Sequence, residues 1–234
     1  MIKEYYAVNM EAVSDLISYL TSIRQKFYLT DNLTLKNVAD YTGITAACIS
    51  TIEKQKVLTP RLETMLTLMN YWQFSDSEIV EVYQALLDKN KKLKLTDKNK
   101  KIITKPVEIN DLEFAALPHF WTKKRKKFNY TFLDVENITG LPNSSVNKME
   151  NSRINSTFKN LIPLCKLYGI TNDEILNFYH RAFKNSDKDS AVNLDYLPKD
   201  ELINIILKLS QNTTNQDKFY SEKVLVKKKG EKND

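Results

Sequence analysis

The sequence predicts an all-α protein made of two similar helical repeats. Only four glycines occur among 234 residues, and two of them, Gly43 and Gly140, occupy the same place in a repeated pattern. Each is followed by an apolar residue, a polar turn and a run ending in Glu, 97 residues apart in the two copies. Because glycine tolerates positive φ, a rare glycine between helical segments indicates a tight helix–helix corner. Two corners in register predict a tandem helix-turn-helix arrangement.

The first helix of each repeat is predicted from residues 16–27 and 117–128, which match at an offset of 101. In the first copy, apolar residues recur at helical spacing and indicate a buried stripe: Leu16, Tyr19, Leu20 and Ile23. The offset then falls to 97, because the first copy carries four extra residues around 28–32. We expect this insertion in a surface loop between the first two helices.

The second and third helices flank the glycine corner. Thr34 is a favourable N-cap for the second helix, and Thr131 is its counterpart. Two apolar residues of each third helix are predicted to point inward: Ile49 and Ile52 in the first copy, Val146 and Met149 in the second. Positions 46, 47, 50 and 51, and 143, 144, 147 and 148, then point outward. We expect Cys48, between them, to be a small buried thiol.

Two further helices complete each repeat. Apolar stripes predict a fourth helix through residues 62–69 and 158–165. Ser75 with Glu78, and Thr171 with Glu174, form capping boxes immediately before apolar runs. The two boxes lie 96 residues apart. Five helices per copy are therefore predicted.

The charge distribution separates four segments. Residues 1–88, the first domain, carry 7 basic and 11 acidic residues, whereas the linker 89–106 carries 8 and 1. The second domain, 107–185, carries 11 and 8, and residues 186–234 carry 9 of each. The linker is either a self-repelling spacer or a basic strand that lies along nucleic-acid phosphates.

Residues 186–234 are interpreted as a connector, a short amphipathic helix beginning near Pro198, and a basic tail. A lone amphipathic helix needs an apolar partner, which is either the second domain or a second copy of the chain. The residues expected at such a homodimer contact are Leu202, Ile205, Ile206 and Leu209.

Several protein classes are excluded by what the sequence lacks. No run of 18 apolar residues predicts a membrane span, and the first residues lack the order of a secretory signal, so we expect a cytoplasmic protein. Two cysteines and two histidines, all scattered, predict neither a metal site nor a disulfide framework. Without a phosphate-binding loop or a nucleophile with a paired base, we expect a protein that is not an enzyme and has no cofactor.

Each repeat resembles the Cro/lambda-repressor (XRE-type) helix-turn-helix family over residues 16–87 and 117–183. The resemblance rests on five helices with a glycine corner between the second and third. In that family an Arg on the first helix commonly pairs with a Glu that ends the third. Arg24 with Glu53, and Arg125 with Glu150, occupy those places.

The resemblance implies a protein that binds double-stranded DNA, with each third helix in a major groove and with helix N-termini and basic side chains on phosphates. The implied base-contacting residues are Ala46, Ala47, Ser50 and Thr51, and Asn143, Ser144, Asn147 and Lys148. The implied phosphate contacts are Lys54, Lys56, Arg61, Arg153 and Lys159. The expected function is a transcriptional regulator, specifically a repressor of phage, plasmid or mobile-element type.

An alternative remains open at this stage. The first repeat is acidic, and its third helix carries few polar side chains, which also suits a domain that binds a partner protein. Under this hypothesis the chain is an antitoxin-like module in which only the second domain binds DNA. A salt-dependent shift of duplex DNA would favour the regulator.

Overall fold

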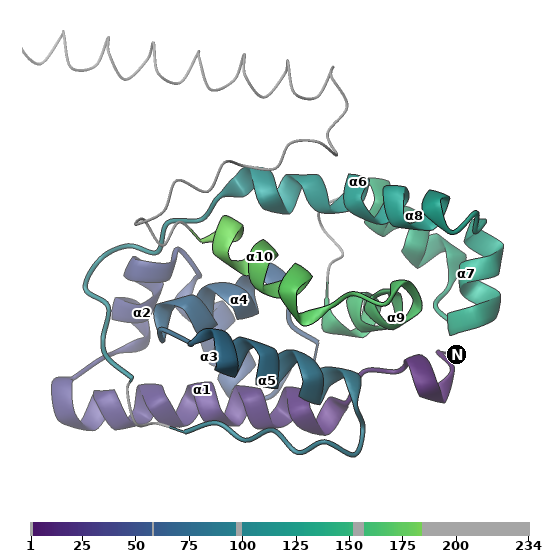
Figure 1. The fold of residues 1–234 in the computed structure, drawn as a ribbon. Helices are drawn as coiled ribbons and strands as arrows, with labels where there is room; N and C mark the ends of the chain where they lie inside the picture. The colour runs from purple at the N-terminus through teal and green to yellow at the C-terminus, as the bar shows by residue number, and fades with distance from the viewer. Residues whose placement is uncertain (1, 58, 97–99, 152–156, 184–234) are drawn as a thin grey trace, which may run out of the picture. The chain divides into compact units, whose positions relative to one another are not determined.

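The computed structural model describes residues 2–57, 59–96, 100–151 and 157–183. Its helices confirm the predicted all-α class, and strand pairing in these residues is limited to two isolated bridges. Figure 1 shows their arrangement. The elements are η1 (Glu4–Tyr6), α1 (Met10–Asp31), α2 (Leu35–Thr42), α3 (Ala46–Glu53), α4 (Leu62–Tyr71), α5 (Asp76–Leu87), α6 (Asp111–Lys127), α7 (Phe132–Thr139), α8 (Asn143–Asn151), α9 (Phe158–Tyr168) and α10 (Asn172–Ala182).

Side-chain caps start the second and fifth helix of each repeat. Both predicted boxes are confirmed, because Ser75 N donates to Glu78 Oε2 at 2.8 Å and Thr171 N donates to Glu174 Oε2 at 3.0 Å. The side chain of Thr34 accepts from the backbone of Asn37, and Thr131 forms the same type of box with Asp134. Each box satisfies backbone donors that an isolated helix end leaves without a partner.

The two glycine corners have the same backbone. Gly43 and Gly140 adopt the left-handed conformation, with φ of 71° and 72°. A residue with a side chain is strained at such a φ, whereas glycine is not. The preceding threonines, Thr42 and Thr139, are buried, and each hydroxyl donates to the carbonyl four residues earlier and accepts an amide two residues later. The direction of each third helix is therefore fixed by a Thr-Gly pair.

The insertion in the first copy lies in a helix, and the expected surface loop is wrong. Helix α1 continues through Asp31 and ends at Asn32, which adopts φ of 54°. The extra residues therefore extend α1 by about one turn, given 3.6 residues per turn. Asparagine tolerates the left-handed conformation and can terminate a helix, so the stop is displaced to Asn32 rather than placed at residue 28.

The two repeats are packed against each other through their fifth helices. All described residues belong to one compact unit, in which α5 contacts α10 and α9. The hydroxyl of Tyr83 on α5 donates to the buried carbonyl of Ile170 at 2.8 Å. Its equivalent 96 residues later, Tyr179 on α10, is also buried, and its hydroxyl lies near the Asn70 side chain of the first repeat. Burial raises the pKa of both phenols above their ordinary value, so both stay protonated and able to donate.

This interface has approximate two-fold symmetry. Arg61 and Thr157, which are equivalent at the same offset of 96, pair with each other in an antiparallel bridge. In a two-fold interface, a residue that contacts its own equivalent lies on the symmetry axis. A contact between residues i and j of the two halves is then matched by a contact between j and i. Tyr83 and Tyr179 are equivalent residues that both lie at this interface, although their neighbours across it, Ile170 and Asn70, are not equivalent. Equivalent elements of the two repeats thus meet at this interface, and we refer to the arrangement as an internal pseudo-dimer.

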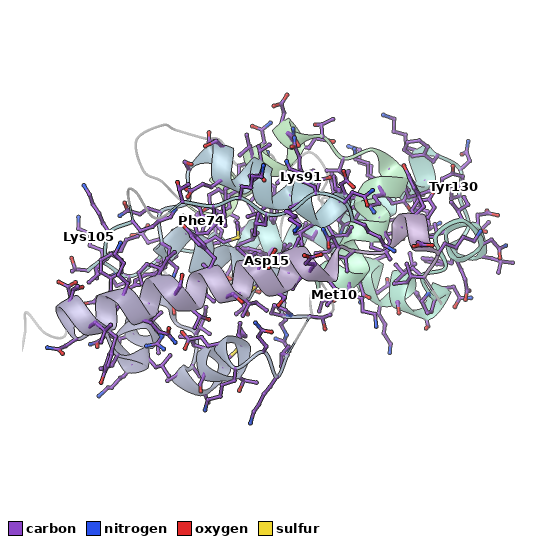
Figure 2. The ribbon with its side chains drawn as sticks, turned by 90° about the horizontal axis from the view of Figure 1, so that it is seen from below. Met10, Asp15, Phe74, Lys91, Lys105 and Tyr130 are labelled. Atoms are coloured by element: carbon purple, nitrogen blue, oxygen red, sulfur yellow. The ribbon has the colours of Figure 1, made fainter. Side chains whose placement is uncertain are left out.

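The segment that joins the repeats is attached to the first one along its described length. Lys91 pairs with Glu81 at 2.8 Å. Lys100, only 4% exposed, pairs with Glu78 at 2.7 Å and lies 4.1 Å from the centre of the Phe74 ring. Lys91 and Phe74 are labelled in Figure 2. The hypothesis of a self-repelling spacer is therefore wrong for this part of the chain, because carboxylates of α5 neutralise the repulsion.

The internal interface predicts a measurable loss of stability. Tyr83→Phe leaves the buried Ile170 carbonyl without its donor, which we expect to lower the free energy of unfolding by about 1–3 kcal/mol. Urea unfolding followed by circular dichroism measures this value. Tyr28→Phe is the matched control, because Tyr28 is 50% exposed on α1. An equal effect of the two substitutions would contradict the assignment of Tyr83 to a buried contact.

Candidate nucleic-acid interface

Helix α8 presents a polar face to solvent. The side chains of Val146 and Met149 are buried in the second repeat. The predicted orientation of this helix is confirmed, because all four outward positions are exposed: Asn143, Ser144, Asn147 and Lys148. Amide, hydroxyl and ammonium groups on one helix face can donate to or accept from base edges.

Helix α3 presents a smaller and less polar face. Ile49 and Ile52 are buried as predicted, and Ala47 is exposed. The outward positions Ala46, Ser50 and Thr51 are half-buried. The expected burial of Cys48 is wrong, since its thiol is exposed. With Ile49 and Ile52 facing the core, the position directly before Ile49 is turned outward by the 100° step of the helix.

The first helix of each repeat holds the third helix in place through an ion pair. In the first repeat, Arg24 Nη2 donates to Glu53 Oε2 at 2.7 Å. In the second, Arg125 donates to both carboxylate oxygens of Glu150, at 2.8 and 2.9 Å. The hydrogen bonds to Glu150 raise the pKa of Arg125, although burial acts in the opposite direction. Paired, two-point contacts of this kind fix orientation as well as distance.

The second ion pair has further support that the sequence reasoning missed. Arg125 Nη1 donates to the Tyr130 carbonyl at 2.9 Å, and its guanidinium lies 4.0 Å from the centre of the Phe132 ring. The aromatic residue at the start of α7 thus stabilises the arginine through a cation–π contact. In the sequence, Phe132 directly follows the Thr131 N-cap. That position is the one signal that could have indicated its place near the first helix.

Most of the implied phosphate contacts are at the surface. Lys54, Lys56, Arg61 and Lys159 are exposed, whereas Arg153 lies outside the described residues. Arg61 belongs to the bridge between the repeats, and Lys159 follows Thr157 of the same bridge by two residues. Basic side chains from both repeats therefore lie near the pseudo-two-fold axis.

The basic run on α6 is divided between structure and surface. Lys124 pairs with Glu174 at 2.7 Å, and Arg125 pairs with Glu150. Burial tends to raise the pKa of Glu174, but hydrogen bonds from Lys124 and Thr171 lower it below its ordinary value. The remaining three lysines, Lys123, Lys126 and Lys127, are exposed. These three are available to anions in solution.

Two polar contacts of α8, with Glu136 and between Asn147 and Asn151, were not predicted. Glu136 Oε2 accepts from the backbone amide of Asn143 at 3.3 Å, so a carboxylate already occupies the start of α8. Asn151 Nδ2 donates to the Asn147 carbonyl at 2.9 Å and also to Asn147 Oδ1. The first contact competes with the phosphate binding implied for this helix N-terminus, and the second restricts the chemistry of Asn147.

Two other features, metal sites and membrane-spanning helices, are absent from the described residues. Within them, no group of three His, Cys, Asp or Glu side chains is placed to hold a metal ion. None of their helices is long and apolar enough to span a membrane. The expected homodimer residues Leu202, Ile205, Ile206 and Leu209 lie outside the described residues.

Comparisons of the chain with protein-family models, curated proteins and solved structures found no match.

The ion pair of the second repeat predicts a stability difference between neighbouring basic residues. Arg125→Met keeps the aliphatic volume but leaves the Glu150 side chain, 2% exposed, without its cation. Breaking a buried pair in this way costs about 3–5 kcal/mol. Lys126→Met is the control, because an exposed substitution changes stability by about 0.5 kcal/mol or less. Thermal unfolding compares the two variants, and similar values for both would show that the pair does not hold α8.

Proposed function

We propose that the chain is a sequence-specific regulator that binds duplex DNA with α3 and α8 in major grooves. The observation that carries the proposal is a duplicated arrangement. Each of these helices follows a Thr-Gly corner, is bound by its Glu to an Arg of the repeat's first helix, and exposes residues of its first turns. This arrangement supports the resemblance to a tandem pair of Cro/lambda-repressor-like domains, a family in which the third helix contacts base edges.

The chemistry of α8 supports direct contact with bases. Its exposed amides and ammonium group match the acceptors and donors of the major groove, where each base pair has a distinct pattern. Three lysines of α6 are exposed and can supply the positive charge that binds phosphates: Lys123, Lys126 and Lys127.

The internal pseudo-dimer supports binding by a single chain. Family members of this kind place two third helices on half-sites about one helical turn apart, and here both helices belong to one polypeptide. Docking of the second helix is then intramolecular and occurs at a high effective concentration. In this proposal the α5–α10 contact, rather than the linker, sets the spacing. Because α3 and α8 differ in sequence, the two half-sites should be unlike.

The family resemblance extends the proposal to a repressor of phage, plasmid or mobile-element type. A protein that occupies two adjacent major grooves can exclude polymerase from a promoter without further chemistry. No cofactor is needed for this mechanism.

A second candidate function is favoured by the face of α3. Its exposed Ala47 and Cys48 offer little to bases, and the first 88 residues carry more acidic than basic groups. In this alternative, which is antitoxin-like, the second repeat alone binds DNA and the first binds a protein partner.

Selection of bound fragments from random duplexes, followed by affinity measurements on the selected sequence, tests the proposal. Asn143→Ala and Asn147→Ala should each weaken binding by about 1–3 kcal/mol and relax the preference at particular bases. Asn90→Ala, an exposed change in the linker 89–106, should have no effect. Affinity should fall steeply as salt rises.

One result would contradict the DNA-binding function, and another would contradict the role of the first repeat. If no duplex is enriched and binding does not depend on salt, the DNA-binding function is wrong. If only one half-site is enriched, and Ser50→Ala and Lys54→Ala leave affinity unchanged, the first repeat does not contact DNA and the alternative is favoured.

A further inference from the structure

The segment before each repeat reaches the glycine corner of the other repeat. Before the first repeat, the backbone amide of Lys3 donates to the carbonyl of Thr139 at 2.8 Å. Before the second, the amide of Val107 donates to the carbonyl of Tyr41 at 2.7 Å. Thr139 is the last residue of α7 and Tyr41 the last but one of α2, so both carbonyls belong to the helix that precedes a corner. We call residues 2–7 the N-terminal arm.

These carbonyls lie where a helix cannot satisfy its own acceptors. The last four carbonyls of an α-helix have no intrahelical partner, so a donor from outside stabilises the helix end. Thr139 is completely buried, and Lys3 supplies an outside donor for its carbonyl. The Thr139 hydroxyl also accepts from the amide of Leu141, two residues before α8 begins. The N-terminal arm therefore binds the residue that sets the direction of α8.

The N-terminal arm is attached to the second repeat at further points. Its short helix η1 packs against α9 (Figure 1). The ammonium group of Lys166 on α9 donates to the carbonyls of Tyr5 at 2.7 Å and Ala7 at 3.1 Å. It also lies 5.6 Å from the centre of the Tyr5 ring. Hydrogen bonds from a charged donor are stronger than neutral ones, so Lys166 holds the arm against the second repeat.

The two segments begin from equivalent points. The amide of Asn9 donates to the Leu86 carbonyl in the last turn of α5, at 3.1 Å. Its equivalent, Asn110, donates to the Ala182 carbonyl in the last turn of α10, at 2.8 Å. Each segment is thus anchored at the fifth helix of its own repeat and makes its corner contact in the other. The exchange is reciprocal, although the two amides that meet the corners are not at equivalent positions.

We propose that the N-terminal arm is a positioning element for α8, so that binding at the second half-site depends on residues that precede the first repeat. This inference rests on the proposed function. A helix that is held in its binding orientation for only part of the time binds with an apparent affinity reduced by that fraction. Loss of one net hydrogen bond at the corner corresponds to about a two- to tenfold loss in the contribution of the second half-site.

The test removes the Lys3 donor and keeps the backbone conformation. Lys3 has a φ of −62°, which proline adopts without strain. Lys3→Pro therefore loses the hydrogen bond to Thr139, whereas the matched control Lys3→Ala keeps the amide and loses only the ammonium side chain.

The contribution of the second half-site is the ratio of two dissociation constants, measured by fluorescence anisotropy. One is for a duplex with that half-site scrambled, and the other is for the selected duplex. The second half-site is identified as the one whose contribution falls in Asn143→Ala. We expect Lys3→Pro to lower the ratio about two- to tenfold and Lys3→Ala to leave it unchanged.

Lys166→Met releases the arm in a second way. It removes the two hydrogen bonds to the arm and leaves Lys3, Thr139 and every residue of α8 intact. This variant should lower the same ratio. The corresponding ratio for the first half-site should not change in either variant, which provides the internal control.

The outcomes separate the two proposals. A chain that binds no duplex overturns the proposed function. If the chain binds its selected duplex but Lys3→Pro or Lys166→Met leaves the second ratio unchanged, this inference alone is overturned. Equal losses in Lys3→Pro and Lys3→Ala would assign the effect to the ammonium group, and equal losses at both half-sites would assign it to general loss of structure. Either result also contradicts the positioning role.

Discussion

The packing of α5 against α10 is the contact on which the rest of the architecture depends. Tyr83 and Tyr179 are buried there, and the Tyr83 hydroxyl donates across the boundary to the Ile170 carbonyl. Each fifth helix packs against the first helix of its own repeat and against the fifth helix of the other repeat. Removal of apolar area from water drives this association, and the Tyr83 hydrogen bond adds specificity. The contact places α3 and α8 in the same compact unit.

Within each repeat, polar contacts hold the third helix in a fixed orientation. A Thr-Gly corner sets the direction in which α3 or α8 leaves the second helix, and an Arg–Glu pair attaches its far end to the first helix. Two fixed ends leave little freedom for a helix of eight or nine residues. The exposed side chains are thus held before any ligand arrives, which lowers the entropic cost of binding.

The sequence predicts the local features because each depends on residues a few positions apart. The capping boxes at Ser75 and Thr171, the corners at Gly43 and Gly140, and the inward residues of α3 and α8 are of this kind. Contacts between distant segments left no periodic signal. The α5–α10 interface, the pairing of Lys100 with Glu78, and the place of Phe132 beside Arg125 each depend on tertiary packing. The length of α1 was mistaken because an insertion was assumed to form a loop. The Asn147–Asn151 bond has helical spacing, but many i, i+4 pairs never form such a bond.

The central claim is that one chain presents α3 and α8 together as a pseudo-dimer to one face of a duplex. Hydroxyl-radical footprinting of the selected duplex at a ratio of one chain per duplex tests it most directly. The account predicts two protected windows about one helical turn, roughly 10 bp, apart on the same face. Protection of a single half-site at this ratio, with a second window appearing only when a second chain binds, would contradict it.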